Sequence, residues 1–443
     1  MSDPELPEMP ATEKELPDIR AEIALFAKHI DSIGHVLIGL VLALQELSKE
    51  SRTKLHAFEE ETCKVEKDGE KRSVAVPNEH YREWKRLVKR FEHFDLSREL
   101  LPRSLLVSLV SQYDAFLGRL LRAVFIKKPE ILNGSDRKIT FEALQHFQSI
   151  DAAREYILEK EIESILRSSH SEQFKWMEKA FSLTLTKDLK AWPIFVELTE
   201  RRNLFVHTDG IVSSQYMAVC NSHGVKLSEG QKEGVSLGVP QEYFKGAHDC
   251  IYEIGVKLAH VLWRKLFPSE RESADNSLIA TSYELIEAGR YSLAIRLLDF
   301  ACEEMKSHAN ELTKLALIVN RAQAYKWSGD QDRCKKIMRA VDWSAKSDQF
   351  RLADAVLRED WPAAAKLVAR IGADGSVSAI DYRDWPLFRE FRKQNSFLDA
   401  YRSTFGVDFS KKAERAHESV PEDEKNADVD AASNEDAVDA PPP

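Results

Sequence analysis

Residues 102–125 read "PRSLLVSLVSQYDAFLGRLLRAVF", the stretch that indicates most about the fold. Its apolar residues return every three or four positions, which is the spacing of one face of an α-helix. Because a helix tolerates proline at its first position, a helix is predicted to begin at Pro102. Asp114 lies among leucines and valines near the middle of this helix. A buried carboxylate needs a partner of opposite charge, so a cation on another helix is expected to meet it.

Helical spacing continues on both sides of this stretch, and it predicts an all-α fold. The apolar run 33–47 is shorter than the roughly 20 residues that cross a bilayer, so it is interpreted as a buried helix with no membrane partner. Residues 208–240 are different, because β-type runs split by glycines predict a small β-hairpin inserted between helices. Residues 66–76 predict a turn or hairpin. The other predicted helices span 19–63, 140–167, 170–181, 191–207 and 240–267.

The net charge of −10 is concentrated at the two ends of the chain. Residues 1–18 carry −5 and residues 411–443 carry −6, which leaves about +1 for residues 19–410. Both ends are poor in aromatic residues and are predicted to be disordered tails. The balanced body neither requires nor excludes a nucleic-acid partner.

The five cysteines show no spacing typical of a disulfide framework or a zinc site. We therefore expect no metal and no cofactor, and a reducing cytoplasmic location. The first residues also lack the basic region of a secretory signal. The sequence contains no phosphate-binding glycine loop and no GxSxG motif. It therefore gives no support for a kinase, a dinucleotide-binding Rossmann domain or a serine hydrolase.

A basic and aromatic segment precedes the apolar helix, at residues 77–101. Lysines and arginines at 82, 85, 86, 89 and 90 alternate with Tyr81, Trp84, Phe91 and Phe94. One interpretation is an RNA-contacting face, since phosphates pair with Lys and Arg and bases stack on aromatic rings. The other is an amphipathic helix with a solvated charged face, because three glutamates are interleaved.

A weak repeat runs through the last third of the chain. Three segments align on a turn followed by a helix, at 288–301, 328–341 and 358–371. Each has a small residue (Ala294, Cys334, Ala364), followed three positions later by an apolar one. The offsets of 40 and 30 residues bracket the 34-residue period of tetratricopeptide repeats, which this part resembles.

Residues 200–210 read "ERRNLFVHTDG" and contain the candidate site. At about 100° per residue, Arg202 falls inside the apolar arc of the predicted helix 191–207, so that arc is expected to face the core. Asn203 and His207 fall one turn apart on the adjoining polar strip, with Glu200 beside them. Asp114 is the carboxylate predicted to hold Arg202.

The segment "RNLFVH" resembles the Arg–(four to six residues)–His signature of HEPN domains. These domains are helical bundles, and many act as metal-independent endoribonucleases. The resemblance implies a HEPN-like domain over 19–268, with its core at about 100–268, and a tetratricopeptide-like domain over 273–410. It assigns catalysis to Arg202, His207 and Asn203, with Asp114, Arg201 and Glu200 in supporting roles.

The chemistry of these residues suits RNA cleavage by the neighbouring 2′-hydroxyl. Histidine can transfer the protons, and arginine can stabilise the charged phosphorane. The products would be a 2′,3′-cyclic phosphate and a 5′-hydroxyl. Because Arg202 and His207 stand about 140° apart on the helix, a composite site in a homodimer is expected, as is common in HEPN nucleases.

Domain architecture suggests a bacterial toxin or phage-defence effector, with a protein partner on the concave face of the repeats. Two alternatives remain open at this point. One is a non-catalytic interaction protein, and the other is a nucleotide sensor that binds a phosphate without cleaving it.

Overall fold

The computed structural model describes residues 17–68, 71–134, 139–140 and 144–409. The two predicted tails therefore lie outside the described residues, except for Pro17 and Asp18 at the end of the first one. The described chain is helical apart from one two-stranded hairpin, which confirms the predicted all-α class.

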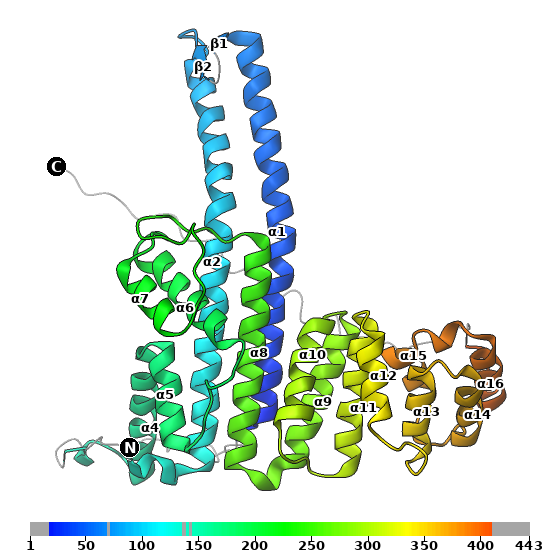
Figure 1. Cartoon of the computed structure of the whole chain (residues 1–443). Helices are drawn as coiled ribbons and strands as arrows, with labels where there is room; N and C mark the ends of the chain where they lie inside the picture. The colour runs from blue at the N-terminus through cyan, green and yellow to red at the C-terminus, as the bar shows by residue number, and fades with distance from the viewer. Residues whose placement is uncertain (1–16, 69–70, 135–138, 141–143, 410–443) are drawn as a thin grey trace, which may run out of the picture. The chain divides into compact units, whose positions relative to one another are not determined.

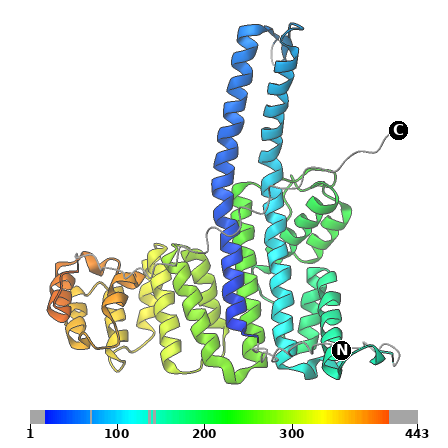
Figure 2. The same cartoon turned by 180° about the vertical axis from the view of Figure 1, so that it is seen from behind.

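Three long helices form the centre of the first unit (Figure 1). They are α1 (Ile19–Thr62), α2 (Tyr81–Lys127) and α8 (Gln241–Leu266). The side chains packed between them include Phe26, Phe116 and Tyr252, which are almost fully buried. Both α1 and α2 extend well beyond α8 as a two-helix arm (Figures 1 and 2). The remaining helices of this region pack on the body end of α2: α4 (Ile150–Arg167), α5 (His170–Phe181), α6 (Trp192–His207) and, on α6, α7 (Ser214–Ser222).

The predicted start of a helix at Pro102 is wrong. Pro102 lies inside the 47-residue helix α2, which continues without interruption from Tyr81 to Lys127. A proline inside a helix removes one hydrogen bond and costs about 3 kcal/mol. Pro102 is buried and its neighbours Leu106, Leu109 and Val110 are fully buried, so packing of the surrounding turns offsets this cost.

The prediction that residues 33–47 form a buried helix is also wrong in part. This run lies within α1, but four of its apolar side chains are exposed: Val36, Leu40, Leu42 and Leu47. Leu42 is the most exposed of them, at 61%. Among the described side chains of this run, Leu37 is the buried one. Of the described helices, α1 is the one whose length and apolar composition match a membrane span, two criteria that helices of soluble bundles also meet.

The hairpin expected at residues 66–76 is present, whereas the one expected within 208–240 is not. Strands β1 (Lys64–Asp68) and β2 (Lys71–Ala75) pair antiparallel at the tip of the arm. Residues 211–239 instead contain the helix α7 and loops, with a single bridge between Ile211 and Ser236. Tyr216 and Cys220 of α7 are buried with Leu204 of α6, so packing on α6 favours helix over strand there.

The helices of the predicted repeats form pairs. The first unit contains α9 (Arg271–Glu287), α10 (Tyr291–Asp299), α11 (Glu311–Trp327) and α12 (Gln331–Arg339), with a short π-helix, η3 (Phe300–Glu304), after α10. The aligned small residues Ala294, Cys334 and Ala364 are all buried, as the repeat pattern requires. The turn before the second helix of each pair has positive φ at Gly289, Gly329 and Glu359, which supports the alignment.

The chain divides into two compact units between Asp342 and Trp343. Helices α9–α12, which the repeat pattern assigns to a separate domain, belong to the first unit because α9 and α10 pack against α8. The second unit contains α13 (Asp348–Leu357), α14 (Trp361–Ile371), α15 (Ala379–Asp384) and α16 (Asn395–Phe405). Its core is rich in aromatic side chains such as Phe388, Phe397 and Tyr401.

The buried histidine of α8, His260, predicts a pH dependence of stability. Both of its ring nitrogens lack a hydrogen-bond partner among the described residues, and burial lowers its pKa from 6.5 to about 3. The unfolded chain therefore binds a proton that the folded chain does not, so stability falls as the pH drops below about 6.5.

Between pH 7 and pH 5 this group should cost about 2 kcal/mol of the free energy of unfolding. Urea unfolding at both pH values should show that His260→Leu loses less stability on acidification than the wild type. The exposed control His207→Ala should behave like the wild type. Equal losses in all three proteins would show that His260 does not contribute.

Candidate functional site

The predicted partner of Arg202 is in place. Arg202 on α6 donates from Nη2 to Oδ2 of Asp114 on α2, at 3.1 Å. Asp114 is partly exposed rather than fully buried, because the side chain keeps 29% of its surface accessible. The pair therefore lies at the edge of the core, where a ligand can reach it.

A second partner of the same carboxylate was missed by sequence reasoning. His170 donates from Nε2 to Oδ1 of Asp114 at 2.9 Å, and its side chain is almost fully buried. It is the first residue of α5, directly after the N-cap Ser169, whose side chain forms a capping box with Glu172. The sequence "SSHSE" marks the start of a helix, but nothing in it indicates a contact with a residue 56 positions earlier.

The cluster is completed by the polar residues on α6. Asn203 donates from Nδ2 to Oε1 of Glu200 at 3.4 Å. Burial raises the pKa of Glu200, although His170, Asn203 and Arg202 act in the opposite direction. Asp114, His170, Glu200 and Arg202 thus combine two carboxylates, an imidazole and a guanidinium at one place between α2, α5 and α6.

The predicted catalytic histidine lies apart from this cluster. His207 is the last residue of α6 and is exposed, and its side chain makes no hydrogen bond or ion pair with the described part of the chain. It stands five residues beyond Arg202, which corresponds to about 7.5 Å along the helix axis. Within one copy, therefore, no contact joins it to Arg202 or Asp114.

A second ion pair fixes the end of α6 on which His207 stands. Arg103 of α2 donates to the backbone and side-chain oxygens of Asp209, at 3.3 and 3.2 Å. Its guanidinium also lies 5.4 Å from the ring centre of Phe205. Because Asp114 meets Arg202 and Arg103 meets Asp209, α6 runs antiparallel to α2 along this stretch.

Arg201, to which a supporting role was assigned, lies in a buried network behind the site. Its guanidinium donates to Glu197 at 2.8 Å and to the carbonyl of Gly238 at 3.1 Å, and it stacks on the ring of Tyr243. Glu197 also accepts from the hydroxyls of Tyr216 and Tyr243, each at 2.7 Å. Burial and the Glu197 carboxylate raise the pKa of both tyrosines. This network holds residues 208–240 against α6.

The exposed side of α6 differs from the prediction. Two residues of the apolar arc expected to face the core, Ile194 and Val206, are 53% and 51% exposed. Phe195 and Leu198 are buried as predicted. By position on the helix, Arg202 falls between Ile194 and Val206. The arc of α6 that carries Arg202 is therefore buried at Phe195 and Leu198 and exposed at Ile194 and Val206.

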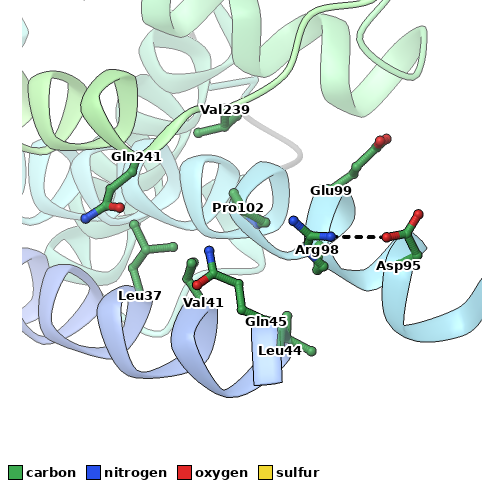
Figure 3. A pocket seen from close by; sticks show the side chains of 10 residues that line it. All are labelled: Leu37, Val41, Leu44, Gln45, Asp95, Arg98, Glu99, Pro102, Val239 and Gln241. Atoms are coloured by element: carbon green, nitrogen blue, oxygen red, sulfur yellow. Dashed lines mark hydrogen bonds and ion pairs between the residues drawn. The ribbon is translucent and has the colours of Figure 1, made fainter. Parts of the chain in front are cut away.

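A separate cavity of about 420 Å³ lies at the base of the arm (Figure 3). Leu37, Val41 and Gln45 of α1 face Pro102 and an Arg98–Asp95 ion pair of α2 across it. Its lining includes none of the predicted site residues. Among the described residues, no group of three His, Cys, Asp or Glu side chains is placed to hold a metal ion.

A comparison of the chain with protein-family models, with curated proteins and with solved structures finds no match.

Proposed function

We propose that the protein is a metal-independent endoribonuclease whose site is built around Arg202 and His207. The observation that carries this proposal is the fixed position of Arg202, which Asp114 holds at the surface of α6. A guanidinium has five N–H donors, and Asp114 occupies one of them. Its Nε–H is buried, so the donors of the two terminal nitrogens that Asp114 leaves open are the ones that can bind phosphate oxygens.

His207 is the proposed proton-transfer group. In the proposed reaction its neutral imidazole takes the proton of the ribose 2′-hydroxyl, whose oxygen then bonds to phosphorus. The bond from phosphorus to the 5′-oxygen breaks, and an imidazolium supplies the proton that this leaving oxygen needs. Arg202 stabilises the negative charge of the phosphorane, and Asn203 orients the phosphate. The products are a 2′,3′-cyclic phosphate and a 5′-hydroxyl.

A second copy of the chain would complete this site. His207 and Arg202 do not converge within one copy, because they stand about 140° apart on α6 and Arg202 is partly buried against Asp114 of α2, whereas His207 is exposed. Exposed Ile194 and Val206 give α6 apolar area that a two-fold interface can bury. Two α6 helices meeting there would bring two arginines and two histidines together, with one histidine as base and the other as acid.

The helical pairs α9–α10 and α11–α12 of the first unit are proposed to bind a regulatory protein, as stacked tetratricopeptide-like repeats do. On this proposal the protein is a cytoplasmic toxin or phage-defence effector. Support comes only from the combination of a candidate nuclease site with helical repeats in one chain.

Arg202→Lys tests the role of the guanidinium. Lysine keeps the charge beside Asp114 but loses the planar fork, so cleavage of a defined RNA should fall by about 100-fold or more while the melting temperature stays within a few degrees. Arg201→Lys is the matched control, because it changes the neighbouring arginine in the buried network. It should lower the melting temperature and leave the folded enzyme active. Full activity of Arg202→Lys would remove Arg202 from the mechanism.

The shared site is tested by assembly. The protein should sediment as a dimer of about 101 kDa, twice the 50.6 kDa chain. Val206→Asp should weaken the dimer and its activity together, because it places a charge in the apolar contact, whereas Val235→Asp on an exposed loop should do neither. Mixed Arg202→Ala and His207→Ala chains should recover part of the activity. A monomer with full nuclease activity would contradict the shared site.

A non-catalytic interaction module is the second candidate function, and a specific observation favours it. His170 and Arg202 both pair with Asp114, which is how a purely structural ion pair would look. Exposed Val36, Leu40 and Leu47 on α1 also offer a surface for a partner helix. Intact RNA together with a captured protein partner would support this candidate, and stabilisation by nucleotides without turnover would indicate a nucleotide sensor.

A further inference from the structure

The arm carries a basic stripe that the proposed catalytic chemistry does not use. Six exposed side chains of α2 form it: Arg82, Lys85, Arg86, Lys89, Arg90 and His93. They line a shallow depression of about 600 Å³ together with Phe94. Their spacing of three and four residues gathers them on an arc of about 140° of one helix.

The stripe points away from α1. Trp84 donates to Glu59 of α1 at 2.9 Å, and Arg52 of α1 lies over the ring of Phe91. At about 100° per residue, Trp84 and Phe91 fall opposite the centre of the basic arc. The basic side chains are therefore presented to solvent, and only Arg90, at the edge of the arc, is near enough to α1 to interact electrostatically with Glu50 among the described residues.

Most of this charge is not neutralised. Arg86 pairs with Glu83 at 3.0 Å, with both side chains exposed, and a pair of this kind contributes little. Arg82, Lys85 and Lys89 make no ion pair with the described residues of the chain. Cations about one helical turn apart on an open surface suit a linear polyanion, whose phosphates follow one another at a similar spacing.

The stripe and the candidate site lie on the same side of α2. By the same helical count, Asp114 falls within the arc of the stripe and Arg103 at its edge, and both contact α6. Figure 1 shows α6 and α7 beside α2, on the side opposite α1. Lys89 and Arg103 are 14 residues apart, which corresponds to a distance on the order of 20 Å along the helix axis. At roughly 3.4 Å per stacked nucleotide, about six nucleotides would bridge this distance.

We infer that this stripe binds single-stranded RNA and guides it along α2 to the end of α6. The geometry favours RNA over an anionic membrane, because a helix that lies in a membrane surface needs an apolar face beside its charges. In the arm Trp84 and Phe91 of α2 face α1, and the basic arc contains no apolar side chain between residues 82 and 93; the exposed Leu96 and Leu100 follow it toward α6. As a route for substrate, the inference rests on the proposed function, whereas the binding itself does not.

Binding is tested with the full-length His207→Ala protein, so that RNA survives the measurement. Fluorescence anisotropy with a labelled, unstructured 20-nucleotide RNA is recorded across a range of KCl concentrations. Neutralising Arg82, Lys85 and Lys89 together to Gln should raise Kd at least tenfold. It should also reduce the slope of log Kd against log salt by about 2, since each lost phosphate contact on single strands removes about 0.7.

The matched control neutralises Lys335, Lys336 and Arg339 to Gln, three exposed residues of α12 that remove the same charge elsewhere. Its Kd should stay within twofold of the parent. Equal weakening in both triple variants, or no RNA binding by the parent, would overturn the inference. The inference would also be overturned if the parent protein bound vesicles of 30% anionic lipid instead of RNA, and if neutralising the stripe abolished that binding.

Kinetics with otherwise wild-type protein separate this inference from the proposed function. Neutralising the stripe should raise KM for the 20-nucleotide RNA at least tenfold with kcat unchanged, and leave cleavage of the dinucleotide UpA as it was. A lower kcat on both substrates would contradict a guiding role. If RNA binds through the stripe but is never cleaved, the binding surface stands and the nuclease proposal fails.

Discussion

Replacing His207 with alanine is expected to lower RNA cleavage by about 100- to 10,000-fold, the range for a lost general acid or base. The protein should stay folded, because His207 is exposed at the end of α6 and makes no hydrogen bond or ion pair with the described residues. Initial rates on a defined RNA, with melting curves of the same samples, measure both effects. Free imidazole should restore part of the activity, since it can take over the proton transfer.

Two controls make this result specific. His35→Ala removes an exposed histidine of α1 and should cleave RNA like the wild type. His170→Ala removes the second partner of Asp114 and should cost less activity than His207→Ala. If His170→Ala were the inactive variant and His207→Ala the active one, the proton-transfer group would belong to the Asp114 cluster.

Glu197→Ala is expected to produce the largest loss of stability. It would leave the guanidinium of Arg201 buried without its carboxylate, and breaking a buried ion pair in this way costs about 3–5 kcal/mol. Tyr216 and Tyr243 would also lose the acceptor of their hydroxyl groups. Chemical unfolding of the variant measures the cost.

Glu200→Ala is the matched control on the same helix. Glu200 is only partly buried and has Asn203 as its one hydrogen-bond partner among the described residues, so the change should cost less than about 1 kcal/mol. A Glu197→Ala protein as stable as Glu200→Ala would mean that the network does not anchor residues 208–240.

The helices could be predicted where the local pattern is strong. α5, α6 and α8 begin and end within two residues of their predicted bounds, and the repeat alignment places the helices α10, α12 and α14. The errors occur where tertiary contacts outweigh local preference. Pro102 continues a helix because its surroundings are buried, and residues 214–222 form α7 because they pack on α6.

The exposed apolar run of α1 could not be foreseen for a related reason. Periodicity shows which residues share a face of a helix, but not whether another element covers that face. Val36, Leu40 and Leu47 are exposed because no element in the described part of the chain covers them.

The candidate site was predictable in part. The pairing of Asp114 with Arg202 follows from two charges placed in apolar helices, and it is present. Arg201 and Arg202 are adjacent, and which of them enters the buried network depends on Glu197, Tyr216 and Tyr243. The contribution of His170 depends on how α5 packs against α2, which one sequence does not specify.

The chemical nature of the RNA ends distinguishes cleavage by the 2′-hydroxyl from hydrolysis by water. Wild-type protein is incubated with a defined RNA in EDTA, and the fragments are identified by mass spectrometry. We expect a 2′,3′-cyclic phosphate on the upstream fragment and a 5′-hydroxyl on the downstream one, formed at a rate that His207→Ala lowers at least 100-fold. RNA that stays intact, fragments with 3′-hydroxyl and 5′-phosphate ends, or equal cleavage by His207→Ala would contradict it.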